Sequence, residues 1–144
     1  MASPQVLLLA IAVVFLLAPA SAEVFMVGDA AGWTLMYPTS WTDGKTFVVG
    51  DSLMFMYPAG KHTVVEVGGA GFKACDVTGN QTIGTWTSGS DTVTLDKAGR
   101  RWFVCGVGNH CAMGMKLLVT VVDATAPAPA PESFRCCDDP QGRI

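Results

Sequence analysis

A chain of 144 residues, half of them hydrophobic, is long enough for one domain with a sizeable core and too short for several. Nine Lys and Arg stand against twelve Asp and Glu, giving a net charge of -3. This balance excludes the basic surface on which nucleic-acid binding depends, so no nucleic-acid partner is expected.

Residues 1–22 have the pattern of a secretory signal peptide. An uncharged apolar run, 6–17, is followed by Pro19 and by the small residues 20–22, which form a cleavage signal. The run of about a dozen residues is too short to cross a ~30 Å hydrocarbon core as a helix. We therefore expect cleavage after Ala22 and a secreted mature chain that begins at Glu23 and has no transmembrane segment.

Short β-rich segments, separated by turns rich in glycine and aspartate, dominate residues 23–122. The segments predicted as strands are Val24–Val27, Asp51–Tyr57, Thr63–Val67, Thr92–Leu95, Arg101–Cys105 and Lys116–Val122. Phe72–Cys75 is predicted only as a brief helical turn. Many short strands at this spacing indicate an all-β fold, an antiparallel sandwich or barrel with Greek-key connections and short helical turns.

The composition changes abruptly after Val122. Alternating Ala and Pro over 124–132 predict an extended, disordered, polyproline-like tract, so 123–144 is interpreted as a Pro-rich and polar tail outside the domain. Residues 133–144 lack the apolar stretch of ~10–20 residues that a glycolipid-anchor signal needs, and no anchor is expected. For Cys136–Cys137, pairing between chains and an altered 3′ end of the coding sequence both stay open.

Secretion changes how the five cysteines and one asparagine are interpreted. An oxidising compartment permits disulfides. The sequon Asn80-Gln81-Thr82 predicts N-glycosylation of Asn80 in a surface turn.

The segment from Cys105 to Met115 carries most of the functional information. It holds Cys105, His110 and Met115 at regular spacing in a glycine-rich loop between two predicted strands, and His62 is the one other histidine of the chain. Two imidazoles, a thiolate and a weak thioether form a ligand set that suits copper in both its Cu(I) and Cu(II) states. The segment therefore predicts electron transfer at a blue-copper site.

Each of these residues also has an ordinary structural interpretation. A lone His62 would more often be a satisfied or exposed histidine, and a lone Cys105 in a secreted chain would usually form a disulfide. Met113 and Met115 alone would be adaptable core residues. Jointly, these interpretations leave unexplained why both histidines bracket a cysteine–histidine–methionine loop.

Three other functions compete with the copper interpretation. Structural zinc favours several thiolates, and a thioether is a poor zinc ligand. A Cys105/His110 nucleophile pair lacks a visible oxyanion-donor motif or a third orienting group, so the chain is not expected to be an enzyme. The third rival is a cell-wall glycoprotein whose Ala-Pro tract is the working part and whose copper domain is a scaffold.

The chain resembles the phytocyanins, the plant blue-copper branch of the cupredoxins, over residues 23 to about 122. The residues that carry the resemblance are Val27–Asp29, Gly32–Trp33, Trp41, Lys45, Phe47, Val49–Asp51, Leu53, Phe55, Tyr57, His62–Val67, Cys75, Trp102–Cys105, His110–Cys111 and Gly114–Lys116. Within the family, an axial Met and a Pro-rich tail are most similar to the uclacyanin subgroup. The chain departs from the family pattern at Thr63, where Asn is usual, and at Phe72, where Tyr is common.

The resemblance implies a site and a crosslink. It gives His62, Cys105 and His110 the equatorial positions around one type 1 copper ion and Met115 the axial position. It also pairs Cys75 with Cys111, which would close a loop of roughly 35 residues and contribute about 3 to 4 kcal/mol through lost chain entropy.

The expected function is that of a secreted copper protein that carries single electrons in the apoplast or cell wall. The sequence does not identify its redox partner, which is a small molecule or a protein. Cell-wall polymers are a further candidate partner.

Overall fold

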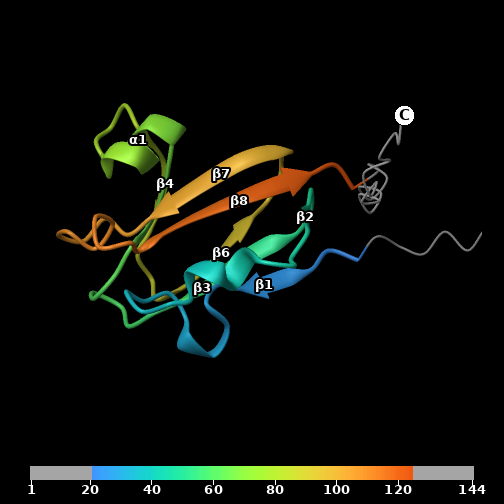
Figure 1. Ribbon diagram of the computed structural model, residues 1–144, viewed down its shortest axis with the longest axis horizontal. Helices are drawn as coiled ribbons and strands as arrows, with labels where there is room; N and C mark the ends of the chain where they lie inside the picture. Colours follow the sequence, from blue (N-terminus) through green and yellow to red (C-terminus); the bar gives the residue numbers. More distant parts are fainter. Residues whose placement is uncertain (1–20, 125–144) are drawn as a thin grey trace, which may run out of the picture.

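The computed structural model describes residues 21–124. The predictions for the signal peptide up to residue 20, for the tail from residue 125 and for Cys136–Cys137 lie outside these residues. The described strands form two sheets that lie face to face as the layers of a sandwich (Figure 1).

The smaller sheet has three strands, in the order β1-β3-β6. They are β1 (Val24–Met26), β3 (Ser52–Met56) and β6 (Ser90–Thr94), with β1 parallel and β6 antiparallel to β3. Leu53 and Phe55 of β3 are fully buried, whereas the residues between and beside them are not. This alternation is the period of two that places one face of a strand on the core.

The larger sheet has five strands, in the order β2-β8-β7-β4-β5. They are β2 (Phe47–Val48), β4 (Val64–Val67), β5 (Thr82–Trp86), β7 (Gly99–Val104) and β8 (Lys116–Val122). β2 runs parallel to β8, and the other neighbours are antiparallel. The long β7–β8 pair spans the sandwich (Figure 1) and ends at the loop that contains Cys105.

An aromatic core joins the two sheets. The Phe55 ring lies 5.3 Å from the Trp33 ring, edge to face, and 5.5 Å from the Phe103 ring of β7. All three side chains are fully buried. Edge-to-face and tilted ring pairs of this kind stabilise a core beyond the area that they bury.

A short helix, α1 (Gly69–Ala74), covers the outer face of the larger sheet at the same end as the Cys105 loop (Figure 1). It is longer than the predicted turn and ends at Cys75, whose φ of 53° is left-handed. Gly71 is required here because a Cβ would lie 2.8 Å from the Asp76 carbonyl oxygen. Two 3-10 helices, Asp29–Ala31 and Thr39–Thr42, complete the described elements. Within residues 21–124, no helix is long and apolar enough to span a bilayer.

The all-β sandwich with short helical turns confirms the predicted fold class. Two of its strand pairs, β1–β3 and β2–β8, are parallel, whereas the sequence predicted an antiparallel arrangement. Strands β2 and β5 are also not among the predicted strands. Strand β5 alternates between exposed and half-buried residues, so its sequence lacks a strongly apolar face. Its central Gly84 resembles a turn residue, yet the Trp86 side chain covers it, and a Cβ there would lie 2.7 Å from the ring. Strand β2 has only two residues.

Candidate metal centre

Cys105 follows β7 directly and lies in the core. Its backbone N–H donates to the Met115 carbonyl at 3.0 Å, which extends the β7–β8 pairing by one step. The side chain is 1% exposed, and among residues 21–124 this is the cysteine left outside a disulfide. The sandwich therefore presents one buried free thiol at this end.

The loop after Cys105 folds back on itself through its own backbone. The Met115 N–H donates to the His110 carbonyl at 3.0 Å, and the His110 N–H donates to the Val107 carbonyl at 3.1 Å. Gly108 and Gly114 adopt left-handed φ values of 50° and 99°, which a residue with a Cβ rarely accepts. These turns bring His110 back over Cys105.

His62 reaches the same place from a different strand. A turn at Pro58–Lys61, closed by a 3.0 Å hydrogen bond from the Lys61 N–H to the Pro58 carbonyl, delivers it to the start of β4. Strand β4 is antiparallel to β7, with Val65 opposite Val104, so the start of β4 adjoins the end of β7. His62 and Cys105 are therefore neighbours across the sheet although 43 residues separate them.

The three side chains converge. The Cys105 Sγ atom lies 3.5 Å from His110 Nδ1 and 3.9 Å from His62 Nδ1, and the two Nδ1 atoms lie 3.2 Å apart. All three donor atoms fall within 4.8 Å of one another. In both imidazoles Nδ1 is the nitrogen that faces the thiol.

The environment favours the neutral imidazole of His62. Burial lowers the pKa of His62, and the facing His110 lowers it further. The neutral ring is the form that ligates a metal. Both histidines are half-buried, while Cys105 lies beneath them.

The two methionines of the loop have opposite environments. Met115 is fully buried in the main core cluster, whereas Met113 is 60% exposed. Met115 is also bonded through its backbone to both Cys105 and His110. Burial thus separates two thioethers that sequence periodicity alone does not distinguish.

Thr63 connects the segment after His62 to the segment after Cys105 through a hydrogen bond. Its hydroxyl oxygen accepts a 2.9 Å hydrogen bond from the Gly106 N–H, and its carbonyl accepts one of 3.0 Å from the Trp33 indole. Gly106 has no left-handed φ; instead a Cβ there would lie 3.1 Å from the Thr63 hydroxyl and from Val65. Close packing, rather than turn freedom, favours glycine at this position, and the sequence gives no signal for that distinction.

A disulfide between Cys75 and Cys111 confirms the pairing that the resemblance implies. It joins the end of α1 to the residue after His110. Lys116 reinforces the connection: its ammonium donates to the Phe72 carbonyl at 3.0 Å and lies 4.6 Å from the centre of the Phe72 ring. The resemblance includes Lys116, but the sequence did not predict this contact.

Asn80 lies exposed in the turn before β5, and its glycosylation stays a prediction.

The donor set fits copper. One free thiol and two imidazoles converge, and a buried thioether follows in the same loop. Soft sulfur ligands suit Cu(I) and imidazole suits Cu(II). His62, Cys105 and His110 therefore form a candidate type 1 copper site, with Met115 nearby.

Comparison with known proteins gives the family. Residues 33–115 match the family described as plastocyanin-like domain. Blue copper protein 1a of Medicago truncatula is 43% identical over 132 residues, which cover 90% of this chain and 80% of that protein. Blue copper protein of Pisum sativum is 44% identical over 118 residues, which cover 81% of this chain and 61% of that protein.

Two solved structures agree in fold. Cucumber stellacyanin matches with a TM-score of 0.65 at 38% identity, covering 72% of this chain and 98% of that one. Cucumber basic protein, a blue copper protein, matches with a TM-score of 0.63 at 38% identity, covering 69% of this chain and 99% of that one. The chain belongs to the phytocyanins, the plant blue copper proteins of cupredoxin fold.

Proposed function

We propose that this chain is a secreted electron carrier that holds one copper ion through His62, Cys105 and His110, with Met115 as the weak axial ligand. The family and the fold imply electron transfer. The observation that carries the assignment of ligands is the buried Cys105 thiol, which faces the Nδ1 atoms of both imidazoles at 3.5 and 3.9 Å.

The structure argues against the two rival sites. With Cys75 and Cys111 joined in a disulfide, the described chain offers one thiolate at this position, whereas structural zinc favours several. A nucleophilic Cys105 would need access to a substrate, but its side chain is 1% exposed. Both observations favour copper.

The residues around the site explain how it would support rapid exchange. Bound copper would supply a centre that gains and loses one electron. Cys105 and Met115 are fixed in the core, and backbone hydrogen bonds hold the loop that carries His110, so the donors need little rearrangement between the two states. The half-buried His62 and His110 rings lie between the thiol and solvent. A partner would therefore exchange electrons through this face.

Location, modification and subgroup remain part of the proposal. Cleavage after Ala22, a glycan on the exposed Asn80 and release to the apoplast or cell wall form one consistent account. The redox partner, a small molecule or a protein, is unidentified, and cell-wall polymers remain a candidate partner. Assignment to the uclacyanin subgroup and the alternative role as a cell-wall glycoprotein depend on the tail, which lies outside the described residues.

Titration with Cu(II) followed by voltammetry tests the function. We expect an intense visible band that saturates at about one equivalent, because a copper–thiolate bond is the source of such colour. The loaded protein should then show a reversible one-electron couple. A Zn(II) titration is the control and should displace neither the band nor the couple once copper is bound. A colourless complex, or saturation at several equivalents, would contradict the proposal.

A further inference from the structure

Asp51 is a buried carboxylate at a strand junction. It is 2% exposed and precedes β3. Its Oδ1 atom accepts a hydrogen bond from the Glu23 N–H at 2.9 Å, and its Oδ2 atom accepts one from the Val48 N–H at 2.9 Å. Its carbonyl also accepts the Leu95 N–H at 2.7 Å. The Asp51 side chain thus ties the residue before β1 to β2 of the larger sheet, and its backbone holds the residue after β6.

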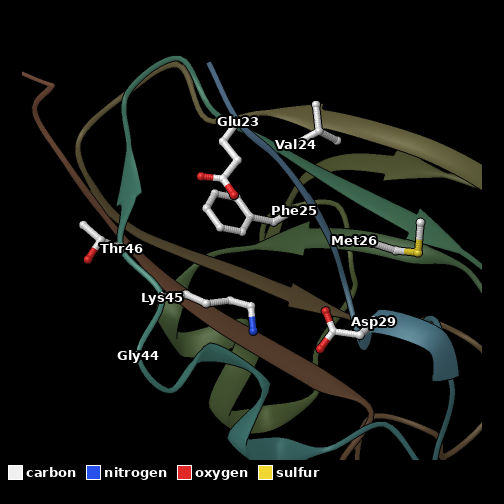
Figure 2. A pocket seen from close by; sticks show the side chains of 8 residues that line it. All are labelled: Glu23, Val24, Phe25, Met26, Asp29, Gly44, Lys45 and Thr46. Carbon is white, nitrogen blue, oxygen red and sulfur yellow. The ribbon is translucent and has the colours of Figure 1, made fainter. Parts of the chain in front are cut away.

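This carboxylate has no cationic partner among residues 21–124. The ion pairs described there join Arg101 to Glu66 and to Asp96. Lys45 belongs to the hollow beside β1 that Glu23 also lines (Figure 2), but its ammonium donates to the Trp41 carbonyl at 2.7 Å. A buried carboxylate held only by neutral donors is costly, and a cation at hydrogen-bond distance would offset that cost.

The nitrogen that donates to Asp51 belongs to the residue that follows the predicted cleavage site. Hydrolysis of the Ala22–Glu23 peptide bond adds one water, leaves a carboxylate on Ala22 and turns the Glu23 amide nitrogen into a primary amine. This amine takes up a proton at neutral pH, since an α-amino group has a pKa of about 7.7–8.0. The charge would therefore appear at an atom that already lies 2.9 Å from Asp51 Oδ1.

We propose that removal of the signal peptide completes an ion pair between the Glu23 α-ammonium, at the edge of the sandwich, and the buried Asp51 carboxylate, and that this pair holds β1 onto the mature sandwich. The inference rests on the predicted cleavage after Ala22. It does not depend on the copper site, which lies at the opposite end of the β7–β8 pair (Figure 1). A charge-assisted hydrogen bond is roughly twice as strong as a neutral one, so processing itself stabilises the fold.

Strand β1 is where such a pair has most effect. It has three residues, pairs only with β3, and leaves Val24 58% and Met26 45% exposed. Of its three side chains, Phe25 packs on the core against Phe47, so the contacts at Glu23 help to fix the start of the strand. The Ser52 N–H donates to the Glu23 carbonyl at 2.8 Å, and the Glu23 N–H donates to Asp51. The precursor would keep the neutral hydrogen bond and lack the charge.

A thermodynamic cycle tests the pair. Two full-length mature proteins are compared, one beginning at Glu23 and one retaining Ser21-Ala22, each with Asp51 and with Asp51→Asn. We expect the Glu23 protein to have a folding equilibrium constant about tenfold larger than the Ser21 protein, which corresponds to about 1.4 kcal/mol. The difference should disappear in the Asp51→Asn background. Equal stability of the two Asp51 proteins, or a difference that survives the substitution, would overturn the proposal.

A second measurement needs no substitution and covers the case in which Asp51→Asn does not fold. Acetylation of the Glu23 α-amine keeps one N–H donor and removes the charge, so it should lower the unfolding midpoint to that of the Ser21 protein. An unchanged midpoint would contradict the ion pair. N-terminal sequencing of the secreted protein tests the cleavage site. An end other than Glu23 would overturn this proposal and would leave the copper function untouched.

Discussion

All four proposed copper ligands lie in segments that adjoin strands β4, β7 and β8 of the larger sheet, and none lies in a strand of the smaller one. His62 leads into β4, Cys105 follows β7, and His110 and Met115 lie in the loop between β7 and β8. These three strands are neighbours in the sheet. The smaller sheet supplies instead the buried side chains of β3 and β6, which close the core opposite the site.

The segments beside the larger sheet therefore provide the metal donors, and the smaller sheet provides the packing that supports them. Adjacent strand ends place donors within 4.8 Å of one another across large sequence distances, while the opposite sheet keeps them buried and rigid. Substitutions in the larger sheet near the site should therefore change colour or potential. Substitutions in the smaller sheet should change stability and leave the spectrum of the folded protein alone.

Phe55→Ala should give the largest loss of stability. Phe55 is fully buried in β3 and contacts Trp33 and, across the core, Phe103. Removing a buried phenylalanine costs about 3–5 kcal/mol. Chemical unfolding measures this cost, and the native fraction should keep its visible band. The neighbouring Met56→Ala, at a 39% exposed position, is the control and should change stability by less than about 0.5 kcal/mol. Loss of the visible band in fully folded Phe55→Ala protein would contradict the different roles assigned to the two sheets.

Met115→Gln should keep a coloured copper site and lower its reduction potential, because an oxygen donor favours Cu(II) over a thioether. Met113→Gln is the matched control within the same loop. Met113 is 60% exposed, so its replacement should leave the potential nearly unchanged. Voltammetry of both variants decides which methionine is the axial ligand. A large shift in the Met113→Gln variant with none in the Met115→Gln variant would assign that role to Met113.

Thr63→Val should have a smaller effect that falls on the site. It removes the hydroxyl that accepts the Gly106 N–H while keeping the shape of the side chain. We expect about 1 kcal/mol less stability, the usual worth of such a hydrogen bond, together with a displaced visible band. Thr63→Ser retains the hydroxyl and should restore the wild-type spectrum. If Val and Ser variants have the same spectrum, the hydrogen bond does not position Cys105.

The two tyrosines should give the smallest effect, confined to high pH. Burial raises the pKa of Tyr37 to about 12, and burial with the hydrogen bond to Asp91 raises the pKa of Tyr57 to about 12. A raised pKa means that the fold favours the neutral phenol. The resulting stability is complete below about pH 10 and is lost as the pH rises toward 12. Tyrosinate absorbance should therefore rise near pH 12, and a rise near pH 10 in folded protein would contradict these environments.

Local patterns predicted several strands and the loop that carries three of the four proposed ligands. Alternation in 51–57 and 116–122 and the Cys105–Met115 spacing are properties of contiguous sequence, so β3, β8 and the loop between β7 and β8 could be predicted without tertiary information. The disulfide came from the resemblance and is confirmed. The assignment of the individual ligands stays a prediction.

Features that depend on tertiary contact could not be predicted. Strand β5 is stabilised by pairing with β4 rather than by an apolar face of its own. Gly106 packs closely against Thr63 and Val65, and the contact between Lys116 and Phe72 joins residues 44 positions apart. None of these pairs has a signature at fixed sequence spacing.

The visible spectrum of the copper-loaded Cys105→Ser protein tests the central claim most directly. Cys105 is the one free thiol beside both imidazoles in the described chain. Serine is nearly isosteric, and the Cys75–Cys111 disulfide stays intact, so the fold should survive, as circular dichroism can verify. The account predicts that the intense blue band disappears completely. A folded Cys105→Ser protein that remains intensely blue would contradict it.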